Sequence, residues 1–140
     1  MEDNAKTYML GIEATLEVIS GKWKGIILHH LTSGRKRTYE LRQLIPKITQ
    51  KVLTQQLREL EKDGIIYRII YNQVPPKVEY ELSQYGWDFK DLLDRFCLWG
   101  EDHLDRIYGD KTKVLEEYSV KEKTPNKHHL FKEACLFEML

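Results

Sequence analysis

Apolar residues recur along most of the chain at the spacing of helices, and one central stretch switches to the pattern of strands. Ile12, Leu16 and Ile19 begin the helical series, because positions three or four residues apart share one face of a helix. Residues 65–71 are β-branched and aromatic, and residues 78–82 alternate apolar with acidic side chains, as in paired strands. The pattern therefore predicts helices over residues 12–19, 22–31, 39–45, 50–63 and 84–108, and antiparallel strands over residues 65–71 and 78–82.

Capping and turn residues fix several of these boundaries. Thr49 is a good N-cap for the helix over 50–63, and Gly64 suits the left-handed conformation after its end. Ser83 can cap the long helix that follows the strands. One side of the helix over 22–31 is expected to carry Trp23, Ile26, Ile27 and Leu31.

This order of elements is the winged helix-turn-helix plan, in which helices joined by a short turn precede a two-stranded hairpin. The predicted fold class is mainly α with a small β-hairpin wing (α+β), flanked by N- and C-terminal dimerisation helices. We assign residues 1–109 to this domain. Residues 110–140 are predicted to form a charged linker and a C-terminal amphipathic helix over residues 130–140.

Charge is spread unevenly along a chain of 140 residues whose formal net charge is zero. Residues 20–80 hold twelve Lys and Arg against five Asp and Glu, a net of +7, whereas residues 81–120 carry a net of −5. A basic centre between acidic flanks indicates a surface suited to nucleic acid. Chance clustering on a solvated surface would give the same count, so the position of the cations decides between the two.

The helix over residues 50–63 separates its apolar and polar side chains sharply. On a helical wheel, one arc of about 100° holds Lys51, Thr54, Gln55, Arg58 and Lys62, with no carboxylate inside it. Leucines form the opposite side, and Glu59 and Glu61 lie at the two edges of the polar arc. Amides, hydroxyls and cations are the groups that contact base edges and phosphates in the major groove. An ordinary exposed helix face is the alternative.

We therefore predict that this helix enters the major groove of double-stranded DNA. The candidate base-contacting residues are Lys51, Thr54, Gln55 and Arg58. The candidate phosphate- or wing-contacting residues are Gln50, Lys47, Lys36, Arg37 and Lys77. The alternative function is a winged-helix module for protein–protein assembly without direct DNA binding, since fold does not fix function.

The long helix over 84–108 carries a heptad-like apolar seam that predicts a homodimer. Its stripe is wider than a small domain can cover, so part of it is expected to face a second copy. The candidate interface residues are Ile12, Leu16, Ile19, Phe89, Leu92, Phe96, Trp99 and His103. In the alternative, the stripe folds back onto its own domain.

The sequence offers little support for catalysis. It contains no nucleophile motif, phosphate-binding glycine loop or paired-carboxylate spacing, so we predict no enzyme activity, cofactor or metal site. Cys97 and Cys135 are too few for a disulfide framework and suit a reducing compartment, and Cys97 is expected to be a small buried hydrophobe. The N-terminus does not resemble a secretory signal, and we predict a cytoplasmic protein.

Several motifs occur in the order typical of one family. They are Glu13–Lys24 with its Gly21-Lys22-Trp23 turn, Glu40–Pro46, Lys51–Gly64, Pro75–Leu82, and Trp99-Gly100. Over about residues 10–108 the sequence resembles the HxlR family of bacterial regulators, which are relatives of MarR.

The resemblance implies a winged-helix homodimer that acts on promoters, and we expect it to repress transcription from a palindromic operator. A small-molecule effector of unknown identity is a further possible partner. Some members of the family sense oxidants or electrophiles through a cysteine before the first helix, in a C-P-x-E arrangement. This chain has Leu10-Gly11-Ile12-Glu13 there. Because leucine has no thiol, that chemistry does not carry over.

Overall fold

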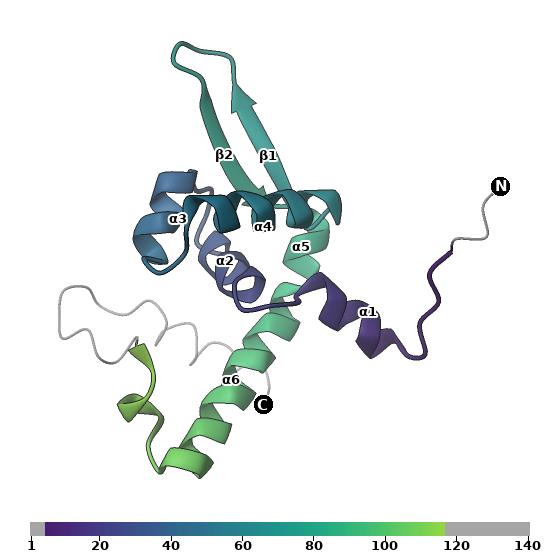
Figure 1. The fold of residues 1–140 in the computed structure, drawn as a ribbon, viewed down its shortest axis with the longest axis vertical. Coiled ribbons are helices and arrows are strands. Elements are labelled where there is room, and N and C mark those ends of the chain that lie inside the picture. The colour runs from purple at the N-terminus through teal and green to yellow at the C-terminus, as the bar shows by residue number, and fades with distance from the viewer. Residues whose placement is uncertain (1–4, 117–140) are drawn as a thin grey trace. The chain divides into compact units, whose positions relative to one another are not determined.

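The chain divides into two compact units, Met1–Lys90 and Asp91–Leu140, and the computed structural model describes residues 5–116. The first unit holds α1 (Gly11–Val18), α2 (Lys24–Leu31), α3 (Thr38–Leu44), α4 (Gln50–Lys62), β1 (Ile66–Tyr71), β2 (Lys77–Leu82) and α5 (Gln84–Asp88) (Figure 1). Helix α6 (Lys90–Tyr108) and the short 3-10 helix η1 (Lys111–Lys113) follow. The predicted order of helices and strands is confirmed through β2, and with it the winged helix-turn-helix fold.

The core of the first unit lies between α2, α3, α4 and the base of the hairpin. Its buried side chains are almost all leucine and isoleucine, including Ile27, Leu28, Leu31, Leu41, Ile48, Leu53, Leu57, Leu60 and Ile66. Burial of one such side chain contributes roughly 1.5–3 kcal/mol. This shared core holds the three helices and the hairpin as one platform.

The buried face of α2 differs from the predicted one. Lys24, Ile27, Leu28 and Leu31 are buried, whereas Ile26 is 37% exposed and Trp23 is half-buried. The buried positions follow the spacing of one helix face, i, i+3, i+4 and i+7. The prediction was right for Ile27 and Leu31, but it placed Trp23 and Ile26 on this face, whereas the structure buries Lys24 and Leu28 there.

Helix α4 begins and ends where its capping residues predict. The Thr49 hydroxyl accepts a hydrogen bond from the Val52 N–H at 3.2 Å, which satisfies one of the free donors at the helix start. Gly64 has a φ of +76° just after the helix, a conformation that favours glycine. Because these residues set where α4 begins and ends, they also set which residues lie on its outer face.

The wing is an antiparallel hairpin of β1 and β2, paired from Ile66 with Leu82 to Tyr71 with Lys77. Figure 1 shows it projecting from the cluster of helices that contains α4. The segment before α3 adds one further pair, because the backbones of Lys36 and Tyr80 exchange hydrogen bonds of 3.0 and 2.8 Å. The basic segment that precedes α3 is thereby attached to the wing.

The predicted long helix over 84–108 is two helices, α5 and α6, separated at Phe89. The Phe89 N–H bonds to the carbonyl of Gly86, three residues earlier, instead of four. Gly86 packs closely against the backbone of Ile65, the residue before β1. A Cβ at position 86 would clash with the Ile65 carbonyl oxygen. The buried Ser83 hydroxyl reinforces this junction, donating to the Gly64 carbonyl at 2.6 Å and accepting from the Gly86 N–H at 3.0 Å. These contacts hold α5 against the residues that precede β1. The series of helical hydrogen bonds is interrupted directly after α5.

In the second unit, η1 follows α6 closely. The Asp105 carboxylate accepts a hydrogen bond from the Lys111 N–H at 2.6 Å, and Asp110 accepts from the Thr112 N–H at 2.9 Å. The start of the predicted linker is therefore structured, while the predicted C-terminal helix over 130–140 lies outside the described residues. The domain boundary predicted at residue 109 stays a prediction. Within residues 5–116, no helix is both long and apolar enough to cross a membrane.

Candidate nucleic-acid interface

The inner and outer faces of α4 have opposite chemistry. Leu53, Leu57 and Leu60 are at most 1% exposed, so the apolar back of the helix is fully packed. The outward-facing predicted residues Gln50, Lys51, Gln55 and Arg58 are exposed, and Thr54 is half-buried. This face therefore presents amides and cations to solvent from a backbone that the core holds in place.

Two of the outer side chains already contact each other. The Gln50 amide donates a hydrogen bond of 3.2 Å to the Thr54 hydroxyl one turn later. The hydroxyl keeps its own proton free to donate, which suits either a base edge or a phosphate oxygen. Contacts along the helix of this kind limit the number of conformations that the outer face adopts.

The predicted phosphate contacts lie on segments around α4. Lys47 is exposed in the turn between α3 and α4. Arg37 precedes α3, where its guanidinium lies 5.3 Å from the ring centre of Tyr39, and Lys36 is half-buried with its ammonium 3.3 Å from the Gly34 carbonyl. These three cations come from the helix-turn-helix and from the segment attached to the wing.

Lys77 is the first residue of β2, one position before the start of the strand predicted over residues 78–82. It pairs with Tyr71 across the hairpin, and its ammonium lies 4.7 Å from that ring's centre and 3.7 Å from the Glu79 carboxylate. Its charge is therefore partly balanced within the wing. Arg68 on β1 is exposed and offers a second cation on the same hairpin.

Sequence reasoning missed an arginine that connects the end of α2 to the wing. Arg35 Nε lies 2.7 Å from a Glu81 carboxylate oxygen, and Arg35 Nη1 donates to the Tyr71 hydroxyl at 3.0 Å. These two hydrogen bonds raise the pKa of Arg35 above its ordinary value, the one to Glu81 more strongly. Arg35 acts as a brace for the hairpin, and no local pattern in the sequence identifies its distant partners.

Sequence reasoning also missed an ion pair between α2 and α4. The ammonium of the buried Lys24 lies 2.7 Å from a carboxylate oxygen of Glu59. The available signal was the position of Lys24 in the same stripe as Ile27, Leu28 and Leu31. A lysine on a buried face needs a partner of opposite charge.

Large apolar side chains are exposed in each unit taken by itself. In the first unit, Ile12 and Leu16 on α1 are 62% and 52% exposed. In the second unit, Phe96 and Trp99 on α6 are 46% and 69% exposed, and His103 stacks on Trp99 with ring centres 5.2 Å apart. The other predicted interface residues, Ile19, Phe89 and Leu92, are half-buried.

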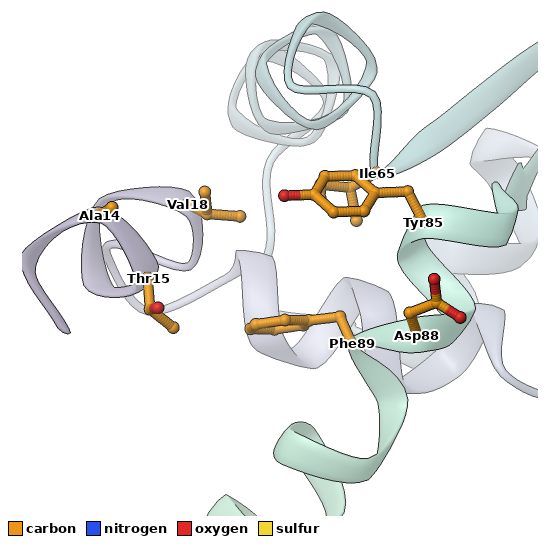
Figure 2. A pocket seen from close by; sticks show the side chains of 7 residues that line it. All are labelled: Ala14, Thr15, Val18, Ile65, Tyr85, Asp88 and Phe89. Atoms are coloured by element: carbon orange, nitrogen blue, oxygen red, sulfur yellow. The ribbon is translucent and has the colours of Figure 1, made fainter. Parts of the chain in front are cut away.

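A small pocket of about 240 Å³ lies between α1 and α5. Its lining residues are Ala14, Thr15, Val18, Ile65, Tyr85, Asp88 and Phe89. Figure 2 shows the rings of Tyr85 and Phe89 extending toward α1 on two sides of the cavity. The cavity is mainly apolar, and its polar groups come from Thr15, Tyr85 and Asp88.

Cys97 is exposed on α6, which corrects the expectation that it is a buried hydrophobe. The buried residues of α6 are Leu93 and Asp94. Cys97 stands four residues after Leu93 and therefore on the same side of the helix, so its exposure shows that the buried part of this face ends before Cys97.

Comparison with known proteins identifies the family of this chain. The model of the HxlR-like helix-turn-helix family matches residues 18–108. YtcD of Bacillus subtilis, an uncharacterized HTH-type transcriptional regulator, is 63% identical over 118 residues, which are 84% of this chain and 94% of YtcD.

Solved structures agree with this match. A crystal structure of ytcD has 65% identity and a TM-score of 0.66, covering 69% of this chain and 99% of that one. The redox regulator HypR in its reduced form has 48% identity and a TM-score of 0.69, covering 71% of this chain and 99% of that one. The resemblance seen in the sequence motifs is confirmed, and the protein belongs to the HxlR-like helix-turn-helix family of transcriptional regulators.

Proposed function

We propose that this protein is a sequence-specific repressor that binds a palindromic operator in double-stranded DNA as a homodimer. The observation that carries the proposal is the outer face of α4, which is exposed, basic and free of carboxylates along its centre. A face of this kind matches the acceptor-rich edges of bases and the negative phosphates. The helix is fixed from behind by three buried leucines.

Within this proposal, residues on α4 contact bases and surrounding cations contact phosphates. Lys51, Thr54, Gln55 and Arg58 contact base edges. Gln50, Lys47, Lys36, Arg37 and Lys77 contact phosphates or position the wing. Phosphate contacts set orientation and affinity, whereas base contacts set specificity.

The proposed dimer uses the exposed apolar faces of α1 and α6. Ile12 and Leu16 on α1 are more than half exposed, and so, on α6 in the other unit, is Trp99; exposed apolar side chains of this kind mark interaction surfaces. A second copy would cover them with the same residues, because a two-fold interface uses one patch on both subunits. Two recognition helices about 34 Å apart then meet successive major grooves.

A regulator of chromosomal DNA acts where that DNA is, so the proposal places the protein in the bacterial cytoplasm. No catalytic role forms part of it. The pocket between α1 and α5 supports a small, mainly apolar effector, because its lining is mainly apolar and includes one carboxylate and two hydroxyls.

A gel-shift titration at several salt concentrations tests this function. The probes are a duplex from the promoter region of the gene that encodes this protein and a scrambled duplex of equal length. The proposal predicts binding at least about a thousand-fold tighter to the promoter duplex. Equal affinity with the usual salt dependence would contradict sequence-specific binding, and no binding to either duplex would favour the protein–protein module.

A further inference from the structure

Arg35 joins the segment between α2 and α3 to both strands of the wing. Its Nε lies 2.7 Å from a carboxylate oxygen of Glu81 on β2, and its Nη1 donates a hydrogen bond of 3.0 Å to the hydroxyl of Tyr71, the last residue of β1. A guanidinium is planar and holds its donors in a fixed arrangement. The bond to Glu81 therefore fixes the direction from which Arg35 holds the Tyr71 hydroxyl.

The Tyr71 ring in turn contacts Lys77. The two residues are direct partners in the pairing of β1 with β2, and the Lys77 ammonium lies over the Tyr71 ring, 4.7 Å from its centre. A cation in this place is attracted by the negative face of the ring. Tyr71 is thus held by Arg35 at its hydroxyl and itself holds Lys77 at its ring.

The register of the hairpin places these groups on one of its two faces. Side chains alternate between faces along a strand, and directly paired residues share a face. Tyr71, Lys77 and Glu81 are therefore on one face, and Arg68, which pairs with Tyr80, is on the other. Arg35 thus bonds to the face that carries Lys77, so the two cations of the wing differ in their relation to it.

We propose that Arg35 is a positioning residue that, through Tyr71, holds the Lys77 ammonium in place for contact with a DNA phosphate. The inference rests on the proposed function, because it assumes that Lys77 contacts DNA. It adds that Arg35 contributes to DNA affinity through Lys77 and not through its own charge. An ammonium that is already ordered loses less side-chain entropy on binding than one that rotates freely.

The test is a set of double-mutant cycles on DNA affinity, measured by gel shift on the promoter duplex. Arg35→Gln removes the guanidinium. Tyr71→Phe removes the hydroxyl that Arg35 binds and keeps the ring and every formal charge. Each is expected to weaken binding roughly two- to five-fold, because the phosphate contact of Lys77 is impaired. Combined with Lys77→Ala, neither should weaken binding beyond the effect of Lys77→Ala alone.

The matched control is Arg68→Ala, which removes a cation from the opposite face of the same hairpin. Its effect should add to that of Arg35→Gln, because the proposed contacts run through Tyr71 on the other face. If the effect of Arg35→Gln adds fully to that of Lys77→Ala, Arg35 contributes its own charge, and the inference is overturned while the proposed function stands. Equal coupling of Arg35 to Lys77 and to Arg68 would also overturn it, because the whole wing would then depend on Arg35.

A second measurement requires no DNA. The Tyr71 ring shifts the NMR signals of the Lys77 side-chain methylene protons as long as the two side chains are in contact. Arg35→Gln and Tyr71→Phe are expected to reduce this ring-current shift, and Arg68→Ala is expected to leave it as in wild type. A shift that Arg35→Gln and Tyr71→Phe both retain would overturn the positioning role even if operator binding is specific. Absence of DNA binding in wild type would instead overturn the proposed function, and this inference with it.

Discussion

Helices α4 and α6 are both amphipathic, but they leave opposite kinds of surface exposed. In α4 the leucines are buried and the exposed face is polar, whereas in α6 Trp99 is 69% exposed and Asp94 is buried. A helix with a polar exposed face is complete within its own unit. A helix that exposes Trp99 and Phe96 indicates that another protein surface is needed to cover it. We therefore propose that the exposed face of α4 serves DNA and that the exposed face of α6 serves a second copy.

The sharpest way to break this comparison is to make the exposed face of α6 polar. Trp99→Asp places a carboxylate where we propose that a second copy packs, and burial of an unpaired charge is strongly unfavourable. We expect monomers in sedimentation at micromolar concentration and a loss of operator affinity of at least about ten-fold, because one half-site is no longer held. The far-UV spectrum of the monomer should stay close to that of wild type, since Trp99 is largely exposed in the single chain, whereas the melting temperature should fall because the dimer contacts are lost. A Trp99→Asp dimer that binds the operator normally would refute the role given to α6.

Removal of polar groups from α4 should have the next largest effect. Arg58→Ala and Gln55→Ala are each expected to weaken binding to the operator by about 1–3 kcal/mol, because a base contact is lost. Binding to random DNA should weaken by less. Gel shifts on both duplexes measure the ratio. Lys113→Ala removes one exposed cation outside α4 and serves as the matched control. An unchanged ratio of affinities in both α4 variants would remove this face from specific recognition.

The wing should contribute affinity without specificity. Lys77→Ala is expected to weaken binding about equally on all sequences and to reduce the slope of log affinity against log salt by about 1. Glu79 and the Tyr71 ring already contact Lys77, so its full charge is not available to phosphate and a smaller decrease is consistent with the structure. A slope identical to wild type would exclude Lys77 from the interface.

The smallest effect is expected from oxidants. The relative HypR is a redox regulator, but this chain has Leu10 where a sensing cysteine of the family would stand. Treatment with diamide should leave the operator affinity unchanged in wild type and in Cys97→Ser. Because Cys97 is exposed on α6, a large effect of diamide that disappears in Cys97→Ser would show that sensing uses this helix instead.

The sequence predicts elements well where the determinants are local. Thr49, the leucines of α4 and Gly64 lie within one short segment, so the start, the buried face and the end of α4 could all be read from it. The wing was predicted for the same reason, since its strands are neighbours along the chain. The roles assigned to the outer residues of α4 remain predictions.

Features that depend on distant partners could not be predicted. The break at Phe89 follows the close packing of Gly86 against the Ile65 carbonyl, which brings together two separate segments. The burial of Lys24 likewise depends on Glu59, which lies on a different helix. In both cases the sequence contains the unusual residue but gives no indication of the group that it meets.

Hydroxyl-radical footprinting on the promoter duplex tests the central claim most directly, because it locates the protein on the DNA. The account predicts two protected clusters related by two-fold symmetry, with centres about 10 base pairs or a multiple of that apart, one for each α4. In Arg58→Ala the same clusters should need a higher protein concentration to form. A single asymmetric cluster, or protection that is uniform along the duplex, would contradict a symmetric dimer that reads its operator through α4.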